Sequence, residues 1–261
     1  MISERIKYFL PDLFIDLARY IKSRFSIVGK GKTLSKNKKC KNVYLNESVN
    51  ILANGPSLSQ EVQESLAGKK VIVMNDFYKS KLKDSFDIVA CCYAEPKISI
   101  AFDESNINDI INNTSAKTYW FDISLSSSNI FENKPYAYFI APGFEPNLYI
   151  KDNIDLSKST LSYNTTASMA IMVAIYMGFK NISLHGFDHD WLANPKHMKH
   201  FYSDSKDSTD HWDKFSYHEQ IKIADRIWSI YKKINQISKK QNISIINKSK
   251  NTFLDIFEID N

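Results

Sequence analysis

Glycine and proline are scarce in this chain, with seven of each among 261 residues. Sandwiches and barrels built only from strands need both residues at their many tight turns, so the scarcity argues against a turn-rich all-β fold. The chain also lacks an uncharged run of about 20 apolar residues, and it does not open with a secretory signal. We therefore expect a cytoplasmic protein without a membrane-spanning helix.

Cysteine is scarce too, and the three that occur suit neither disulfides nor a metal site. Cys40 stands alone, while Cys91 and Cys92 lie within an apolar run. An odd number of cysteines without metal-ligand spacing is typical of reduced thiols that pack as small hydrophobic groups. A reducing compartment fits this usage.

Acidic residues are absent between Arg19 and Lys41, where nine lysine and arginine residues occur. The whole chain has a formal net charge of +5, so the rest of the chain is net acidic. Nucleic-acid binding is not expected, because it would need basic residues and stacking aromatics spread along one face.

Residues 1–41 form an N-terminal extension in this interpretation. Apolar residues recur at helical spacing over residues 2–25, with Pro11 as a break, and the basic stretch Lys30–Lys41 has the composition of a linker. One reading is a helix packed on the domain with a solvated tail behind it. The other is an interfacial helix beside a polybasic segment, peripherally bound to the anionic cytoplasmic face of the inner membrane.

From residue 42 onward, apolar segments of strand and helix length alternate, which predicts one α/β domain over 42–261. The expected strands are Val49–Ala53, Lys70–Met74, Phe86–Cys92, Lys117–Phe121, Tyr136–Ile140, Asn181–His185 and Ile243–Ile246. The expected helices are Gln60–Ala67, Phe102–Ile111, Ala167–Met177 and His218–Lys240. We predict a doubly wound, mostly parallel, Rossmann-like sheet, with residues 192–217 as a lid.

The stretch Val49–Leu58 reads V-N-I-L-A-N-G-P-S-L, an apolar strand that ends abruptly in a polar turn. Gly55 can take a positive φ or allow a close backbone approach. Asn54 and Ser57 bring polar side chains, and Ser57 could cap the next helix. The alternative is a tight strand-to-helix turn without a ligand.

Polar residues follow two further strands and precede one apolar helix. Asn75 and Asp76 end the second strand, and Asp188, His189 and Asp190 follow the strand at Asn181–His185. The cap cluster Asn164–Thr166 precedes a helix that is apolar on nearly all sides. Ligands bind at the carboxyl ends of such strands, and neutral donors of this kind suit a nucleotide. Neither a Walker motif nor the G-x-G-x-x-G fingerprint occurs.

The histidines are clustered late in the chain. They are His185, His189, His197, His200, His211 and His218. Three readings stay open: a metal site, a lid that supplies a general base and leaving-group donors, or a solvated polar loop.

Several motifs resemble those of bacterial sialyltransferases of glycosyltransferase family 42. These are A-N-G-P-S-L, M-N-D-F-Y at the end of the second strand, and the segment from Thr165 through G-F-K-N-I to G-F-D. The resemblance covers roughly residues 49–190 with a gap in the middle. A related group, motility-associated glycosyltransferase-like or 6-hydroxymethylpterin diphosphokinase-like proteins, shares the turn and a G-x-D-H element.

The resemblance implies a GT-A-like sialyltransferase variant of the fold and an inverting, metal-independent transfer from a CMP-linked sugar to a glycan hydroxyl, with no cofactor. Such an enzyme would serve bacterial surface polysaccharide biosynthesis, in O-antigen, capsule or lipooligosaccharide, and its partners would be the nucleotide-sugar donor and a glycan or lipid-linked acceptor. The sequence leaves the oligomeric state open, and a homo-oligomer is one of the alternatives.

The same resemblance implies the site residues. The donor-binding residues would be Asn54, Gly55, Pro56, Ser57, Asn75, Asp76, Thr165, Thr166 and Asp188. His218 would be the general base, with His211 as the fallback. Asp190, flanked by His189, and Tyr202 would assist the leaving phosphate.

Two other functions remain open. One is pyrophosphoryl transfer to a pterin with ATP and Mg²⁺, in which Asp188, His189 and Asp190 would be metal ligands. The other is a non-catalytic assembly subunit at the membrane.

Overall fold

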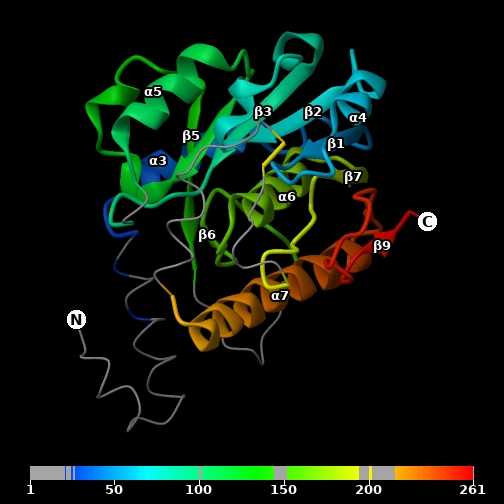
Figure 1. The fold of residues 1–261 in the computed structure, drawn as a ribbon. Coiled ribbons are helices and arrows are strands. Elements are labelled where there is room, and N and C mark those ends of the chain that lie inside the picture. The colour runs from blue at the N-terminus through cyan, green and yellow to red at the C-terminus, as the bar shows by residue number, and fades with distance from the viewer. Residues whose placement is uncertain are drawn as a thin grey trace, which may run out of the picture.

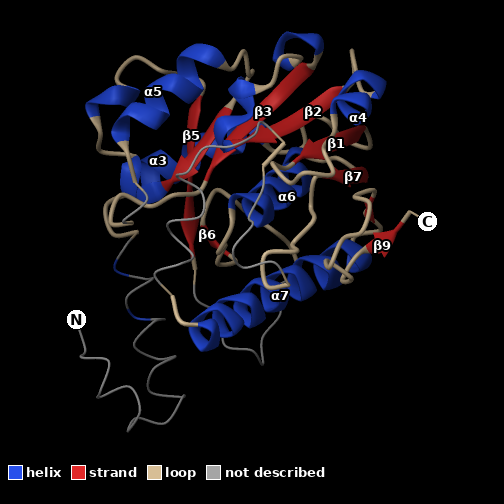
Figure 2. Ribbon diagram, viewed as in Figure 1, coloured by secondary structure: helices blue, strands red, loops and turns tan. Residues whose placement is uncertain are grey.

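The computed structural model describes Ile21, Phe25 and residues 27–99, 102–143, 152–193, 200–201 and 215–260. Within these residues the chain forms one nine-stranded sheet between two layers of helices (Figures 1 and 2). Nearly all of the expected helix at 2–25 and most of the expected lid at 192–217 lie outside the described residues.

Every strand pair in the sheet is parallel, in the order β6-β5-β4-β3-β2-β1-β7-β8-β9. The strands are β1 Ser48–Leu52, β2 Lys70–Met74, β3 Asp87–Tyr93, β4 Tyr119–Asp122, β5 Ala137–Pro142, β6 Ser159–Thr160, β7 Asn181–His185, β8 Ser244–Asn247 and β9 Glu258–Ile259. The central strands are buried on both faces, which is why they read as continuous apolar runs. The predicted doubly wound α/β class is confirmed.

The chain covers one face of the sheet first and the other face second. Helices α4 (Gln60–Ser65) and α5 (Glu104–Asn113) pack on one face, and α6 (Thr166–Met177) and α7 (Tyr217–Lys240) pack on the other. Ile51 of β1 belongs to the core shared with α6, whereas Leu52 faces the α4 side, as alternation along a strand requires. The strand order reverses at β1, so the topological switch point lies between β1 and β7.

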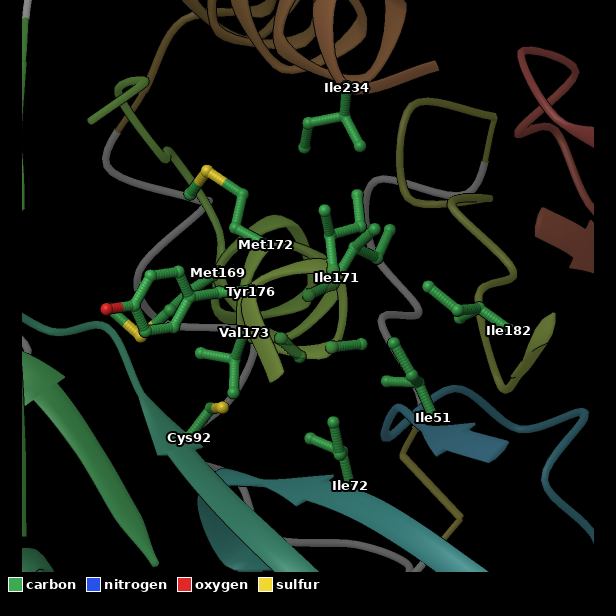
Figure 3. Packing of buried hydrophobic residues seen from close by; sticks show 14 of the residues in the cluster. Ile51, Ile72, Cys92, Met169, Ile171, Met172, Val173, Tyr176, Ile182 and Ile234 are labelled. Carbon is green, nitrogen blue, oxygen red and sulfur yellow. The ribbon is translucent and has the colours of Figure 1, made fainter. Parts of the chain in front are cut away.

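Helix α6 lies between the sheet and α7 (Figures 2 and 3). Every residue from Ala167 to Met177 is buried. Ile171 and Met172 point from the helix into this core, where Ile51 of β1 and Ile234 of α7 also lie (Figure 3). Thr165 caps the amino end, and Gly178, with a φ of 98°, ends the helix in the left-handed region. The predicted buried, capped helix is confirmed.

The basic stretch Lys30–Lys41 differs from the expected linker. It contains the helix α3 (Gly31–Ser35) and the 3-10 turn η1 (Lys36–Cys40). Leu34 and Cys40 are buried, and the buried Asn37 donates from Nδ2 to the carbonyls of Phe139 and Leu156, both at 2.7 Å. Leu34, Asn37 and Cys40 anchor the segment, and the half-buried Lys36 donates to the carbonyl of Ala137 at 2.8 Å, so the segment packs as part of the domain.

The other differences are short elements. The 3-10 turns are η2 Asn75–Lys79, η3 Lys83–Ser85, η4 Ile123–Leu125 and η5 Asn129–Phe131. Within the described residues, no helix combines the length and apolarity that crossing a membrane requires.

Candidate functional site

The loops after β1 and β7 meet at the switch point, and the contact leaves no room for a side chain at Gly55. The Gly55 amide donates to the carbonyl of Gly186 at 3.0 Å. A Cβ on Gly55 would lie 1.8 Å from Oδ2 of Asp188. The expected close approach is therefore present, but between two protein loops, and the φ of Gly55 is not positive. Pro56 follows within the same turn.

Asp188 binds the loop that follows β1 through its carboxylate. The Ser57 amide donates to Oδ1 at 3.2 Å, and the Ser57 hydroxyl donates to Oδ2 at 2.9 Å. Burial raises the pKa of Asp188, and the two Ser57 donors oppose that shift. Ser57 does not cap the next helix, because Ser59 accepts from the Val62 amide and is the N-cap of α4. The Ser57 hydroxyl is thus already engaged.

The C-terminal segment holds the loop after β7 through hydrogen bonds to its backbone. The Thr252 hydroxyl donates to the carbonyl of Phe187 at 2.6 Å, and the Phe253 amide donates to that of Asp188 at 2.9 Å. The Phe187 amide donates to the Ser249 hydroxyl at 2.8 Å. The backbone that carries the Asp188 carboxylate is therefore held on both sides.

Asn54 is buried, and its Oδ1 has no hydrogen-bond partner within the described part of the chain. Its backbone carbonyl accepts from the Phe201 amide at 3.0 Å and faces Nδ1 of His200 at 3.3 Å. Buried polar atoms in folded proteins are nearly always hydrogen-bonded. An orphaned amide oxygen at the end of β1 is therefore suited to a donor group on a ligand.

The amino end of α6 meets the ends of β2 and β3. The Thr166 hydroxyl donates to Oδ1 of Asn75 at 3.0 Å and accepts from the Ala94 amide at 3.3 Å. Asn75 has a φ of 48°, in the left-handed region that asparagine tolerates. The first turn of α6 contains no acidic residue. Because the Thr166 hydroxyl is engaged and the Ser168 amide is capped by Thr165, the amides of Thr166 and Ala167 are what the helix offers an anion.

His189 lies half-buried beside α7. Its Nε2 is 3.0 Å from the hydroxyl of Tyr231, and its ring also contacts Trp228 edge-on. Burial lowers the pKa of His189 to about 4, which leaves the ring neutral near pH 7. A cationic role toward a leaving phosphate is therefore not available to it at that pH. Asp190 beside it is partly buried.

The remaining predicted residues do not join this group. Asp76 is paired with Lys79 at 2.6 Å. His218 is exposed on the first turn of α7, ten residues before Trp228, which corresponds to about 15 Å along the helix axis. His211 and Tyr202 lie outside the described residues. Their assigned roles stay predictions.

The histidines that the structure describes lie in separate places rather than in one cluster. His185 is buried at the end of β7, with Nε2 3.1 Å from Oδ1 of Asn50, and burial lowers its pKa to about 4. His200 lies against the carbonyl of Asn54. Within the described ranges, no group of three or more His, Cys, Asp or Glu side chains converges as a metal site would require.

Sequence reasoning missed Tyr231, and it named His200 only as a member of the histidine cluster. Tyr231 occupies a core position of an amphipathic helix, where an aromatic residue usually signals packing alone.

A separate surface pocket of about 260 Å³ is lined by Gln63, Ser80 and Phe201 among others. It adjoins the site through Phe201, whose amide donates to the carbonyl of Asn54.

No protein-family model and no curated protein matches the chain. Among solved structures, the sialyltransferase CstII from Campylobacter jejuni in complex with the substrate analogue CMP-3FNeuAc is 18% identical, with 82% of this chain and 86% of that chain covered and a TM-score of 0.49. The sialyltransferase CST-II in complex with a trisaccharide acceptor and CMP is 15% identical, with 82% and 86% covered and a TM-score of 0.47.

A MAf glycosyltransferase from Magnetospirillum magneticum AMB-1 is 11% identical, with 88% of this chain and 38% of that chain covered and a TM-score of 0.46. At identities and TM-scores this low, we base the function on the residues of the site.

Replacing Gly55 by alanine should destabilise the protein, because the new methyl group would overlap the Asp188 carboxylate. We expect the free energy of unfolding in urea to fall by about 1–3 kcal/mol, as for an overpacked core. Gly31→Ala is the matched control, since a Cβ there meets no atom within 4 Å. Equal stability of the two variants would show that the loops separate at little cost.

His185 and His189, whose pKa values desolvation lowers, should make stability depend on pH. The unfolded chain takes up protons near the ordinary pKa of 6.5, whereas the folded chain does so near 4. The contribution of the two neutral histidines to the free energy of unfolding is therefore fully present above pH 6.5. It is lost as the pH falls toward 4, by about 1.4 kcal/mol per pH unit for each histidine. Urea unfolding of His185→Gln between pH 7 and 4.5 should show a shallower slope than the natural protein, and identical slopes would contradict this.

Proposed function

We propose that the chain is a glycosyltransferase that transfers a sugar from a CMP-linked, sialic-acid-like donor to a glycan hydroxyl with inversion. The observation that carries the proposal is the polar group at the switch-point edge. There the orphaned amide oxygen of Asn54 accompanies the free amino end of α6, which the Thr166–Asn75 hydrogen bond attaches to β2. The sequence motifs shared with family 42 lie on these same elements.

The chemistry of the edge suits a nucleotide donor. The first-turn N–H groups of α6 and the helix dipole favour a phosphate or a carboxylate. The Asn54 amide oxygen would accept from a ligand group that donates, such as an amino group of the base or a sugar hydroxyl. These groups are neutral, so the donor would be held without a Walker lysine.

The reaction we propose is a single displacement. His218 takes the proton of the acceptor hydroxyl, the hydroxyl oxygen forms a bond to the anomeric carbon, and the bond from that carbon to the phosphate oxygen breaks. The electron pair of the broken bond leaves with the nucleotide. Tyr202 donates a hydrogen bond to the departing phosphate oxygen, and His189 supports the loop that carries Asp190. A role in surface polysaccharide biosynthesis would follow from an acceptor of that class.

The alternative of Mg²⁺-dependent pyrophosphoryl transfer has less support from the geometry. Both oxygens of Asp188 accept hydrogen bonds from Ser57, and Nε2 of His189 lies against the Tyr231 hydroxyl. A metal would have to displace both sets of contacts before these side chains could coordinate it. The side chains assigned to that metal are thus already engaged in hydrogen bonds within the protein.

Binding of CMP to the full chain, measured by calorimetry with a chelator present, tests the proposal directly. We expect binding without Mg²⁺, and about tenfold weaker binding for Thr166→Val, which loses the hydrogen bond to Asn75. Thr114→Val is the matched control, because this buried hydroxyl has no partner among the described residues. Binding of ATP only with Mg²⁺, and none of CMP, would favour the pyrophosphoryl alternative.

The general base is tested by sugar transfer from CMP-sialic acid to an oligosaccharide acceptor. We expect His218→Ala to lower the rate about 10²–10⁴-fold, as loss of a general base does, with CMP binding retained. Lys222→Ala, an exposed change on the same helix, should leave the rate unchanged. If His218→Ala and the fallback variant His211→Ala both keep near natural rates, the base assignment is wrong.

A further inference from the structure

The hydroxyl of Tyr231 lies buried between the loop after β7 and the amino end of α6. Tyr231 is fully buried in α7. Its oxygen is 3.0 Å from Nε2 of His189 and 3.4 Å from Oγ1 of Thr165, which is the N-cap of α6. One hydroxyl therefore connects three elements: the loop of β7, helix α7 and helix α6.

The direction of the hydrogen bonds along this chain follows from the proton of Thr165. The Thr165 hydroxyl donates to Oγ of Ser168 at 3.2 Å, and the Ser168 hydroxyl donates in turn to the carbonyl of Thr165. Oγ1 of Thr165 is then an acceptor toward Tyr231, so the Tyr231 hydroxyl donates to it. The oxygen of Tyr231 is left to accept from Nε2–H of the neutral His189 ring.

The Thr165 oxygen has a second task in the same chain. It accepts from the Ser168 amide at 3.1 Å, which is the capping hydrogen bond of α6. With its proton directed to Oγ of Ser168, the Thr165 oxygen accepts from both the Ser168 amide and the Tyr231 hydroxyl. The cap is thus oriented from outside the helix.

Packing alone does not account for this tyrosine. Its ring contacts His189 and Phe257 edge-on, and phenylalanine would make the same contacts. A buried hydroxyl costs free energy unless it is hydrogen-bonded, so a tyrosine here implies that its hydrogen bonds have a use.

We propose that Tyr231 is a positioning residue of the donor site, which orients the Thr165 cap and so holds the first-turn N–H groups of α6 in place for the donor's phosphate. The identity of that ligand rests on the proposed function. Tyr231 itself acts only through Thr165 and His189. Because His189 lies next to Asp188 and Asp190, the same hydroxyl keeps the loop of β7 in register with the helix end.

Tyr231→Phe removes the hydroxyl and keeps the ring. In the full chain without ligand, we expect amide hydrogen exchange at Ser168 to become about tenfold faster, and the Kd for CMP to rise about tenfold. Tyr44→Phe is the control, because Tyr44 stacks on Phe179 at the opposite end of α6. It should change neither value by more than about twofold.

The two readouts separate the two proposals. If the natural protein binds CMP and Tyr231→Phe binds it equally well, the positioning role is overturned. If the natural protein binds no CMP, the proposed function fails, and unchanged Ser168 exchange in Tyr231→Phe would then overturn the inference as well. Should Tyr231→Phe not fold, Thr165→Val measured with the same two readouts replaces it, and unchanged values would overturn the inference.

Discussion

The contact between the loops after β1 and β7 is the constraint on which the rest of the site depends. Asp188 accepts two hydrogen bonds from Ser57 and occupies the space that a side chain at Gly55 would need. This contact joins the loops that follow β1 and β7, the two strands on either side of the switch point, where the chain changes from one face of the sheet to the other. The conformation of the turn at 54–57 is therefore set by contacts within the protein. What it leaves for a ligand is the amide oxygen of Asn54.

The hydroxyl groups nearby are likewise already engaged in hydrogen bonds within the protein. Ser57 and Thr166 both donate to internal acceptors, and Thr165 caps α6. These side chains build the edge of the site, and the helix amides remain for the anion. Hydroxyls used in this way hold the backbone in one arrangement before any ligand arrives, which lowers the conformational entropy lost on binding.

Much of the fold could be predicted because its signals are local. Helix α6 is apolar on all sides between a threonine cap and a glycine, and the buried strands are short apolar runs. The packing of Lys30–Lys41 could not be predicted, because its lysines dominate the composition while Leu34, Asn37 and Cys40 anchor it through distant partners. Likewise Ser57 and Ser59 are equivalent as caps in the sequence, and only the position of Asp188 decides between them. Tyr231 gains its partners from elements far apart in the chain, which no local pattern reveals.

The central place of β1 has a consequence for how the protein is made. Residues 48–52 pair with residues 181–185, and the loop behind Asp188 is held by residues 249–253, close to the end of the described chain. During synthesis β1 emerges well before β7, and until β7 arrives the backbone N–H and C=O groups along one edge of β1 are unpaired. An early, unpaired strand edge is a template for misassembly, so folding of the nascent chain should depend on protection of that edge. The binding edge therefore cannot be complete until residues near 250 have been made, although β1, which begins it, is made about 200 residues earlier.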